Sequence, residues 1–309
     1  MAQPAHIAFL GFGEAARAFC WTLGKADPAL KFSAYDIKLG GPEASAMSGA
    51  MARAGVTVVN AAEGLADADW IVSAVTADQS LEAIGPLVPA LGPGTLVIDI
   101  NSVSPGRKRQ TAELICATGA AYLDMAVMSP VHPKGHASPV LLAGQGIDGL
   151  RAPLDRLGFA YDVAGDEPGA ATAIKMVRSL FVKGLEAITV ETLLAAEASG
   201  CRDVILSSLA ASYPGLEWPA LAGYNFERTL RHGARRAVEM EESAATLDAL
   251  GLNGGLAREI AAVQRAQGAA GAASLCGETL HDIVANNLRA RMKACPRQDD
   301  DAEKVPPET

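Results

Sequence analysis

Short apolar segments alternate with segments of helical periodicity through the first half of the chain, and only helical periodicity follows. Apolar runs of this length, bounded by glycine or polar residues, are typical of buried strands. We expect strands at His6–Gly11, Lys31–Asp36, Val56–Val59, Trp70–Thr76, Thr95–Ile100, Tyr122–Val127, Pro139–Ala143 and Phe159–Val163. Strands that alternate with helices predict βαβ crossovers, so we expect an α/β fold with a doubly wound, mainly parallel sheet of the Rossmann type.

Helical segments lie between these strands and then make up the rest of the chain. We expect helices after Gly11 and at Glu43–Ala54, Asp78–Leu91, Ser104–Thr118, Asp148–Leu157, Asp203–Ser212, Phe226–Leu250, Leu256–Gly268 and Leu275–Met292. The sequence therefore predicts a Rossmann-type domain at residues 1–166, a small all-α domain at 167–295, and a polar, disordered tail at 296–309.

One long helix is expected to join the two domains. The segment Gly165–Gly200 starts with acidic residues and Pro168, which suit the first turn of a helix, and it ends at a glycine. Its faces are mostly apolar or small, so we expect residues 167–200 to form a largely buried interdomain helix. Ligand clefts commonly form at such a boundary.

Three polar residues interrupt this apolar helix. Lys175, Arg178 and Ser179 lie at i, i+3 and i+4, so they share one face of one turn. Two cations crowded on a buried helix are costly unless they meet an anion or a reacting group. The alternative is a lysine whose ammonium group reaches solvent along an amphipathic helix. Because Arg178 and the domain boundary are close, we favour a functional lysine.

A glycine-rich turn follows the first expected strand. Residues Gly11–Ala16 form a GxGxxA pattern, in which Gly11 permits a tight turn and Gly13 lets the backbone approach a pyrophosphate. Asp36 ends the second strand, where an acidic residue binds ribose hydroxyls. The alternative is an ordinary strand–helix turn, but its context favours dinucleotide binding. The residues expected to bind the cofactor are Gly11, Phe12, Gly13, Glu14, Ala15, Asp36, Val75, Thr76 and Asn101.

Asp36 also bears on which nucleotide is bound. A carboxylate at this place accepts a hydrogen bond from the 2′-hydroxyl of NAD and repels the 2′-phosphate of NADP. Lys38, two residues further on, would weaken that repulsion. We therefore favour NAD(H) over NADP(H).

Polar residues follow the fifth expected strand. The carboxyl ends of parallel strands line the ligand crevice, so Asn101 and Ser102 would place an amide and a hydroxyl there. The alternative is that Ser102 or Ser104 caps the next helix, with Pro105 in its first turn. Both interpretations hold if the two serines divide these tasks.

A loop rich in proline, glycine and histidine follows a later strand, at Met128–Pro139. His132 and His136 would be candidate metal ligands. The loop offers no third ligand at a suitable spacing, and its prolines prevent a helical pair of ligands. We therefore expect no metal.

Composition and charge indicate which binding partners and which cellular compartment to expect. The formal net charge is −9, which disfavours nucleic acid. Five scattered cysteines without a CxxC pair indicate reduced thiols and a cytoplasmic protein. The N-terminus leads directly into a strand, so we expect no signal peptide. The apolar runs are short or interrupted by charge, so we expect no membrane span.

Taken in order, these motifs resemble the β-hydroxyacid dehydrogenase superfamily, and within it a divergent branch similar to 6-phosphogluconate dehydrogenase. The glycine signature of that superfamily matches Gly11–Ala16, and its segment after the fifth strand matches Asp99, Asn101 and Ser102. Its catalytic lysine falls on Lys175. Its substrate loop matches Asp124–Pro130 only in part, because Met128, Ser129 and Pro130 replace a Ser-Gly-Gly sequence.

The resemblance implies an NAD(P)-dependent oxidoreductase that interconverts a small hydroxy acid and its oxo form. Lys175 would be the general acid and base, with its pKa lowered by burial and by Arg178. Asn101 and Ser179 would orient the substrate, and its acidic group would be held by Ser102, Ser129 and Arg178. Ser179 stands where the superfamily usually has asparagine, and Arg178 where 6-phosphogluconate dehydrogenases have histidine. These departures argue against 6-phosphogluconate and 3-hydroxyisobutyrate as substrates.

The resemblance also implies a homodimer formed through the helical domains. A charged run on the helix at Phe226–Leu250 places His232, Arg236 and Glu239 on one stripe. Such a run is commonly a solvated face, but His232 or Arg236 would also suit a substrate contact. Two alternatives stay open, namely an imine reductase of the same fold, and a non-catalytic NAD(H)-binding sensor or interaction protein. Lys175 favours hydroxy-acid chemistry over both.

Overall fold

The computed structural model describes residues 3–277 and 279–294. This part of the chain forms two compact units. The first contains the residues up to Phe181 together with Val238–Arg258, and the second contains Val182–Ala237 and the residues from Glu259 onward. The expected boundary between residues 166 and 167 stays a prediction. Each packing unit combines two separate segments of the chain, so the units do not correspond to the expected domains one to one. The expected tail at 296–309 lies outside the described residues.

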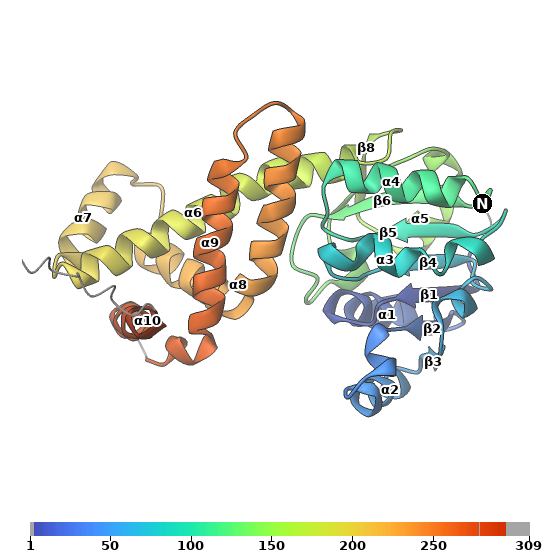
Figure 1. Ribbon diagram of the computed structural model, residues 1–309, viewed down its shortest axis with the longest axis horizontal. Helices are drawn as coiled ribbons and strands as arrows, with labels where there is room; N and C mark the ends of the chain where they lie inside the picture. Colours follow the sequence, from blue (N-terminus) through green and yellow to red (C-terminus); the bar gives the residue numbers. More distant parts are fainter. Residues whose placement is uncertain (1–2, 278, 295–309) are drawn as a thin grey trace, which may run out of the picture. The chain divides into compact units, whose positions relative to one another are not determined.

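An eight-stranded sheet forms the centre of the first unit (Figure 1). Its strands are β1 (His6–Leu10), β2 (Lys31–Tyr35), β3 (Thr57–Val58), β4 (Trp70–Ser73), β5 (Leu96–Asp99), β6 (Ala121–Val127), β7 (Val140–Ala143) and β8 (Tyr161–Gly165). Their order is β3-β2-β1-β4-β5-β6-β7-β8. All neighbouring pairs are parallel except β6 and β7. The predicted mainly parallel sheet is therefore confirmed.

Helices cover both faces of this sheet. They are α1 (Glu14–Ala26), α2 (Ala44–Arg53), α3 (Ser80–Ile84), α4 (Pro105–Cys116) and α5 (Arg151–Leu157). Along β1, Ile7 and Phe9 join one buried cluster with α1, α2 and α5, while Ala8 and Leu10 join another with α3 and α4. Burial on both faces explains why the strands are continuous apolar runs. The doubly wound α/β fold is confirmed.

The helix expected at Asp78–Leu91 is largely wrong. Only α3 is α-helical there, flanked by 3-10 turns at Ala77–Gln79 and Val88–Ala90. Pro86 and Pro89 lack backbone N–H groups, so a continuous helix cannot form.

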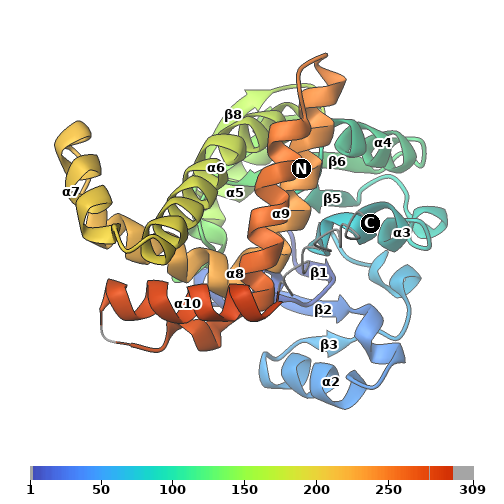
Figure 2. The ribbon, with the colours of Figure 1, turned by 60° about the vertical axis from the view of Figure 1, so that its left-hand side comes forward.

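The helical half of the fold also agrees with expectation. It contains α6 (Ala170–Ala198), α7 (Arg202–Ser212), α8 (Trp218–Ala249), α9 (Gly255–Ala270) and α10 (Leu280–Ala294). The core of the second unit joins Val190 and Leu193 of α6 to Phe226 of α8 and Val284 of α10. Figure 2 shows the ribbons of these three helices. The helices α6 and α8 each belong partly to both units. Within the described residues, no helix combines the length and the apolar character that a membrane span requires.

One face of α6 is more exposed than the sequence predicts. Ile174, Val177 and Phe181 are 47%, 54% and 73% exposed. They recur at spacings of three and four residues and therefore form a stripe on one face. The prediction of a largely buried helix is wrong for this face.

Candidate active site

The glycine turn leaves an open surface at the end of β1. Gly11 has a φ of 86°, and a Cβ atom there would lie 2.7 Å from the carbonyl oxygen of Ala74. Only glycine fits this position. A Cβ atom on Gly13 would have no heavy atom within 4 Å, so the backbone there faces open space. A tight turn beside an accessible helix N-terminus fits a dinucleotide pyrophosphate.

Asp36 is tied to this turn by its carboxylate. Its Oδ2 atom accepts a hydrogen bond from the Phe12 N–H at 2.8 Å, and its Oδ1 atom accepts one from the Lys38 N–H at 3.0 Å. The Lys38 side chain pairs with Glu43 at 2.9 Å, and this hydrogen bond raises the pKa of Lys38. The Lys38 charge is therefore engaged by Glu43 in addition to lying near Asp36.

Asn101 braces the ends of two neighbouring strands. Its Oδ1 atom accepts a hydrogen bond from the Val75 N–H at 2.7 Å, and its Nδ2 atom donates one to Ser73 Oγ at 2.9 Å. The Asn101 side chain is buried, while Val75 is half-buried and Thr76 is exposed. Asn101 thus fixes the segment after β4, and its role toward substrate or cofactor stays a prediction.

Lys175 meets Ser102 at the carboxyl end of β5. The Lys175 ammonium group donates a hydrogen bond to Ser102 Oγ at 2.7 Å, and both side chains are half-buried. Ser104 occupies the N-cap position of α4, but its hydroxyl makes no capping hydrogen bond. The backbone N–H of Ser104 donates instead to Glu242 Oε2 at 2.6 Å. Ser102 is therefore directed to Lys175 rather than to capping.

The other expected substrate residues differ in exposure and in the unit to which they belong. Ser179 is buried one turn after Lys175 on α6, whereas Arg178 is exposed. Ser129 is exposed, and its hydroxyl lies 3.4 Å from the carbonyl oxygen of Pro130. His232 belongs to α8 in the second unit. The sequence predicted that Arg178 belongs to a polar patch on a buried helix. That prediction is wrong for Arg178, because its side chain is exposed to solvent.

A buried ionic cluster near this site was missed by the sequence analysis. The Lys108 ammonium group lies 2.9 Å from Asp99 Oδ1 and 3.3 Å from Asp124 Oδ1, and all three side chains are at most 1% exposed. A lysine on a short helix suggests a solvated side chain, so periodicity gave no signal for it. The only sequence signal was that two acidic residues, Asp99 and Asp124, lie within neighbouring apolar strands.

The two histidines of the Met128–Pro139 loop occupy different environments. His136 is buried, with Nδ1 2.7 Å from Thr22 Oγ1 and Nε2 2.7 Å from the carbonyl oxygen of Leu157. Burial lowers the pKa of His136. His132 is exposed and lies 4.0 Å from Glu14. Residues 3–277 and 279–294 contain no cluster of three or more His, Cys, Asp or Glu side chains suited to a metal.

The charged run on α8 is only partly a solvated face. Arg236 is 7% exposed and pairs with Glu186 of α6, which is 2% exposed. Glu239 is also buried. The prediction of a solvated stripe is therefore wrong for these residues, because a partner on another helix compensates the Arg236 charge.

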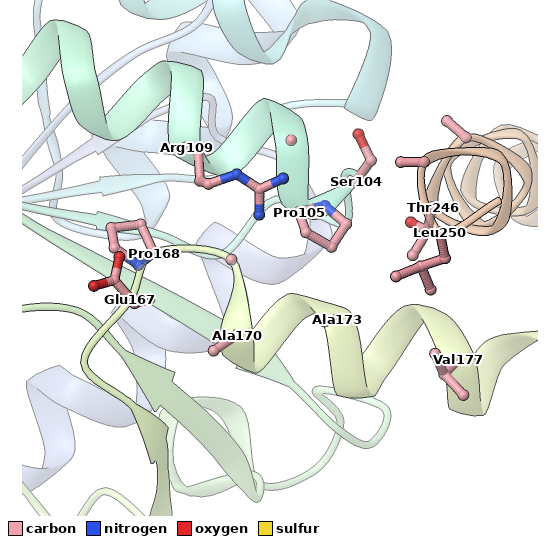
Figure 3. Close-up of a pocket in the computed structure, with 14 residues that line it drawn as sticks. Ser104, Pro105, Arg109, Glu167, Pro168, Ala170, Ala173, Val177, Thr246 and Leu250 are labelled. Atoms are coloured by element: carbon pink, nitrogen blue, oxygen red, sulfur yellow. The ribbon is translucent and has the colours of Figure 1, made fainter.

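A separate pocket of about 470 Å³ lies on the first unit (Figure 3). Its lining residues are Ser104, Pro105, Gly106, Arg109, Glu167, Pro168, Gly169, Ala170, Ala173, Val177, Ala245, Thr246, Ala249 and Leu250. Because a helix turns about 100° per residue, Ala170, Ala173 and Val177 point away from Lys175. This pocket is therefore distinct from the Lys175–Ser102 pair.

The sheet, the glycine turn and the helical second half define a Rossmann-type oxidoreductase with an NAD(P)-binding domain. Residues 6–102 match the family described as NADP oxidoreductase coenzyme F420-dependent. Residues 196–267 match a family described as Domain of unknown function (DUF1932).

Similar proteins extend over most of the chain. A conserved hypothetical protein from Sinorhizobium meliloti 1021 is 34% identical, with a TM-score of 0.71 over 93% of this chain and 96% of that one. A conserved protein described as structurally similar to 3-hydroxyacid dehydrogenases is 26% identical, with a TM-score of 0.64 over 94% and 99%. An NAD-dependent L-serine dehydrogenase from Pseudomonas aeruginosa is 24% identical over 71% of this chain and 73% of its own length. The chain spans 66% and 73% of the lengths of two curated relatives that it matches.

These matches and the fold agree with the resemblance drawn from the motifs. The chain belongs to the β-hydroxyacid dehydrogenase-like superfamily.

Proposed function

We propose that this protein interconverts a small hydroxy acid and its oxo form, using a nicotinamide cofactor and Lys175 as the general acid and base. The observation that carries the proposal is the 2.7 Å hydrogen bond from Lys175 to Ser102, beside Asn101 at the carboxyl end of β5. Ligands of open α/β sheets bind at this edge. The same unit carries the glycine turn and Asp36.

The cofactor would be held by the turn Gly11–Ala15, by Asp36, and by the segment Val75–Thr76 after β4. A bound nicotinamide would supply hydride transfer to or from the carbon that bears the substrate oxygen. Asp36 would accept a hydrogen bond from the ribose, since each of its oxygens has further acceptor capacity. We propose NAD(H) as the preferred cofactor, because the Asp36 carboxylate repels a 2′-phosphate and Lys38 is engaged by Glu43.

Lys175 would move the proton in this reaction. In oxidation, its neutral amine would take the proton of the substrate hydroxyl as the C–H bond is lost as hydride. In reduction, its ammonium group would return that proton to the carbonyl oxygen. Ser102 would hold the amine in place, and Ser179, one turn further along α6, would contact the substrate.

A small acid is the proposed substrate class. Arg178 follows Lys175 on α6 and is exposed, so its guanidinium group is available for a two-pronged contact with a carboxylate. The similarity to an L-serine dehydrogenase supports this class. Ser129 completes the proposed set of substrate contacts in the first unit, and a role for His232 of the second unit stays a prediction.

We also propose a homodimer. The stripe of Ile174, Val177 and Phe181 exposes large apolar side chains that a second copy of the chain would cover. Light scattering after size exclusion would test this with Phe181→Glu. A dimeric wild type and a monomeric variant are expected, whereas a monomeric wild type would contradict the proposal.

The first experiment is a thermal-shift screen with NAD, NADH, NADP and NADPH, repeated with L-serine and other small hydroxy acids. A ligand that binds only the folded state raises Tm with occupancy. Turnover should then fall by about 10²–10⁴-fold in Lys175→Met while the shift with NAD persists. Full turnover in that variant would refute the assigned role, and turnover of cyclic imines alone would favour imine reduction.

A further inference from the structure

The two partners of the Lys175–Ser102 hydrogen bond are each attached to one carboxylate of the buried ionic cluster. Asp124, on β6, accepts hydrogen bonds from the N–H groups of Gly169 and Thr172, both at 3.1 Å, and from the Thr172 hydroxyl at 2.8 Å. These groups form the start of α6. Lys175 projects from the next turn of the same helix, three residues after Thr172.

Asp99 holds the other side. Its Oδ1 atom accepts a hydrogen bond from the Asn101 N–H at 2.9 Å, immediately before Ser102. Its Oδ2 atom accepts one from the Tyr122 hydroxyl at 2.8 Å. Burial raises the pKa of Tyr122 well above its ordinary value, and the nearby charges of Asp99 and Asp124 add to this effect, so the phenol stays a donor.

Lys108 joins the two sides. Its ammonium group contacts both carboxylates and also donates to the carbonyl oxygen of Asp99 at 2.7 Å. The three donors of an ammonium group are thereby matched to three oxygens. The remaining negative charge faces the N-terminus of α6, which carries a positive partial charge. The cluster is therefore satisfied without solvent.

From this arrangement we infer that Lys108, Asp99 and Asp124 are positioning residues that set the separation between the Lys175 amine and Ser102. Each carboxylate fixes the backbone next to one partner, and Lys108 fixes the carboxylates to each other. The inference rests on the proposed function for its catalytic meaning. Its geometric content, which is the placement of Lys175, is independent of any reaction.

The test uses the full-length protein and a series of mild variants. Thr172→Val removes one hydroxyl bond to Asp124, and Thr172→Ser retains it. Asp124→Asn weakens the whole attachment of α6. Thr111→Val is the matched control, because Thr111 is also a buried helical threonine of the first unit, and its hydroxyl bonds to the Arg107 carbonyl of its own helix.

The first readout needs neither cofactor nor substrate. Lys175 is acetylated by an N-hydroxysuccinimide ester, and its labelling rate relative to exposed Lys134 is measured by mass spectrometry. Release from Ser102 should speed the labelling of Lys175 by about threefold or more in Thr172→Val and Asp124→Asn, as expected for the loss of one hydrogen bond. Thr172→Ser and Thr111→Val should behave as wild type.

The second readout is turnover of L-serine with NAD. With Lys175 displaced, kcat should fall by about tenfold in Thr172→Val and about a hundredfold in Asp124→Asn, while KM stays within about twofold. Unchanged labelling and kcat in both folded variants would overturn the inference. If labelling changes as expected but Lys175→Met keeps its turnover, the proposed function is wrong and the placement of Lys175 by the cluster stands.

Discussion

The two units of the molecule both bury charged side chains, but they do so in different settings. In the first unit, one lysine lies between Asp99 at the end of β5 and Asp124 in the middle of β6, and backbone N–H groups of Asn101 and of the start of α6 complete the hydrogen bonds. In the second unit, Arg236 of α8 pairs with Glu186 of α6, and Gln264 of α9 donates to the same carboxylate at 3.0 Å.

The second setting is less complete. Among the described residues, Gln264 Oε1, Gln267 Oε1 and Asn287 Nδ2 are buried without a hydrogen-bond partner. Buried polar groups of this kind fix how helices pack. We infer from this comparison that the first cluster places the proposed reacting groups, whereas the second aligns helices.

The largest expected effect is that of Lys108→Met. This change leaves Asp99 and Asp124 buried without their cation, so the free energy of unfolding should fall by about 4 kcal/mol. Urea denaturation followed by circular dichroism measures it. A loss below about 1 kcal/mol would mean that solvent reaches the two carboxylates and that the cluster is not a closed unit.

A smaller effect is expected in the second unit from Arg236→Met, which should cost about 3 kcal/mol because Glu186 stays buried. The double variant Glu186→Met with Arg236→Met should return to within about 1 kcal/mol of wild type, since apolar side chains can replace a buried pair. The same urea titrations serve here. A double variant as unstable as the single one would contradict this prediction, because apolar side chains would then fail to replace the buried pair.

Asp36 is a third carboxylate to compare with those of the two clusters. It accepts hydrogen bonds from backbone N–H groups at the edge of the proposed cofactor site. Asp36→Asn removes the charge that opposes a 2′-phosphate. The ratio of the Kd values for NADP and NAD should therefore fall by about tenfold, or about 1.4 kcal/mol. Isothermal titration gives both constants, with Glu43→Gln as a control for Lys38. An unchanged ratio would place nucleotide selection elsewhere.

The smallest expected effect is on the pH dependence of stability and comes from His136, a buried side chain that makes no ion pair within the described residues. Burial lowers the pKa of His136, although its hydrogen bond with the Leu157 carbonyl opposes this in part. The unfolded side chain takes up a proton as pH falls below 6.5, whereas the folded one resists. Stability from this group is therefore full above that pH and is lost as pH falls through the folded pKa. Urea midpoints at pH 7.5 and 5.5 should differ less in His136→Gln than in wild type.

The sequence predicted the fold far better than the contacts of the site. Strands buried on both faces are continuous apolar runs, which can be recognised in a sequence. Gly11 and Asp36 follow the first two strands at the positions expected in a dinucleotide-binding domain. Lys175 and Ser102 were each singled out, but their pairing depends on how α6 approaches β5, which no local pattern encodes. Lys108 was missed because it lies on α4 and its partners come from two strands of the sheet. Arg236 was named, but its burial was not foreseen because its partner Glu186 is 50 residues away.

The first unit takes its last piece, Val238–Arg258, from a late part of the chain. Glu242 from that piece accepts the hydrogen bond of Ser104 N–H at the start of α4, 138 residues earlier, and lies 3.5 Å from Arg107. During synthesis, the start of α4 therefore lacks its contacts with Glu242 until that residue has been made. A nascent chain that ends before residue 258 would carry the whole sheet and still lack part of the first unit, so we expect this unit to complete its packing only late in synthesis.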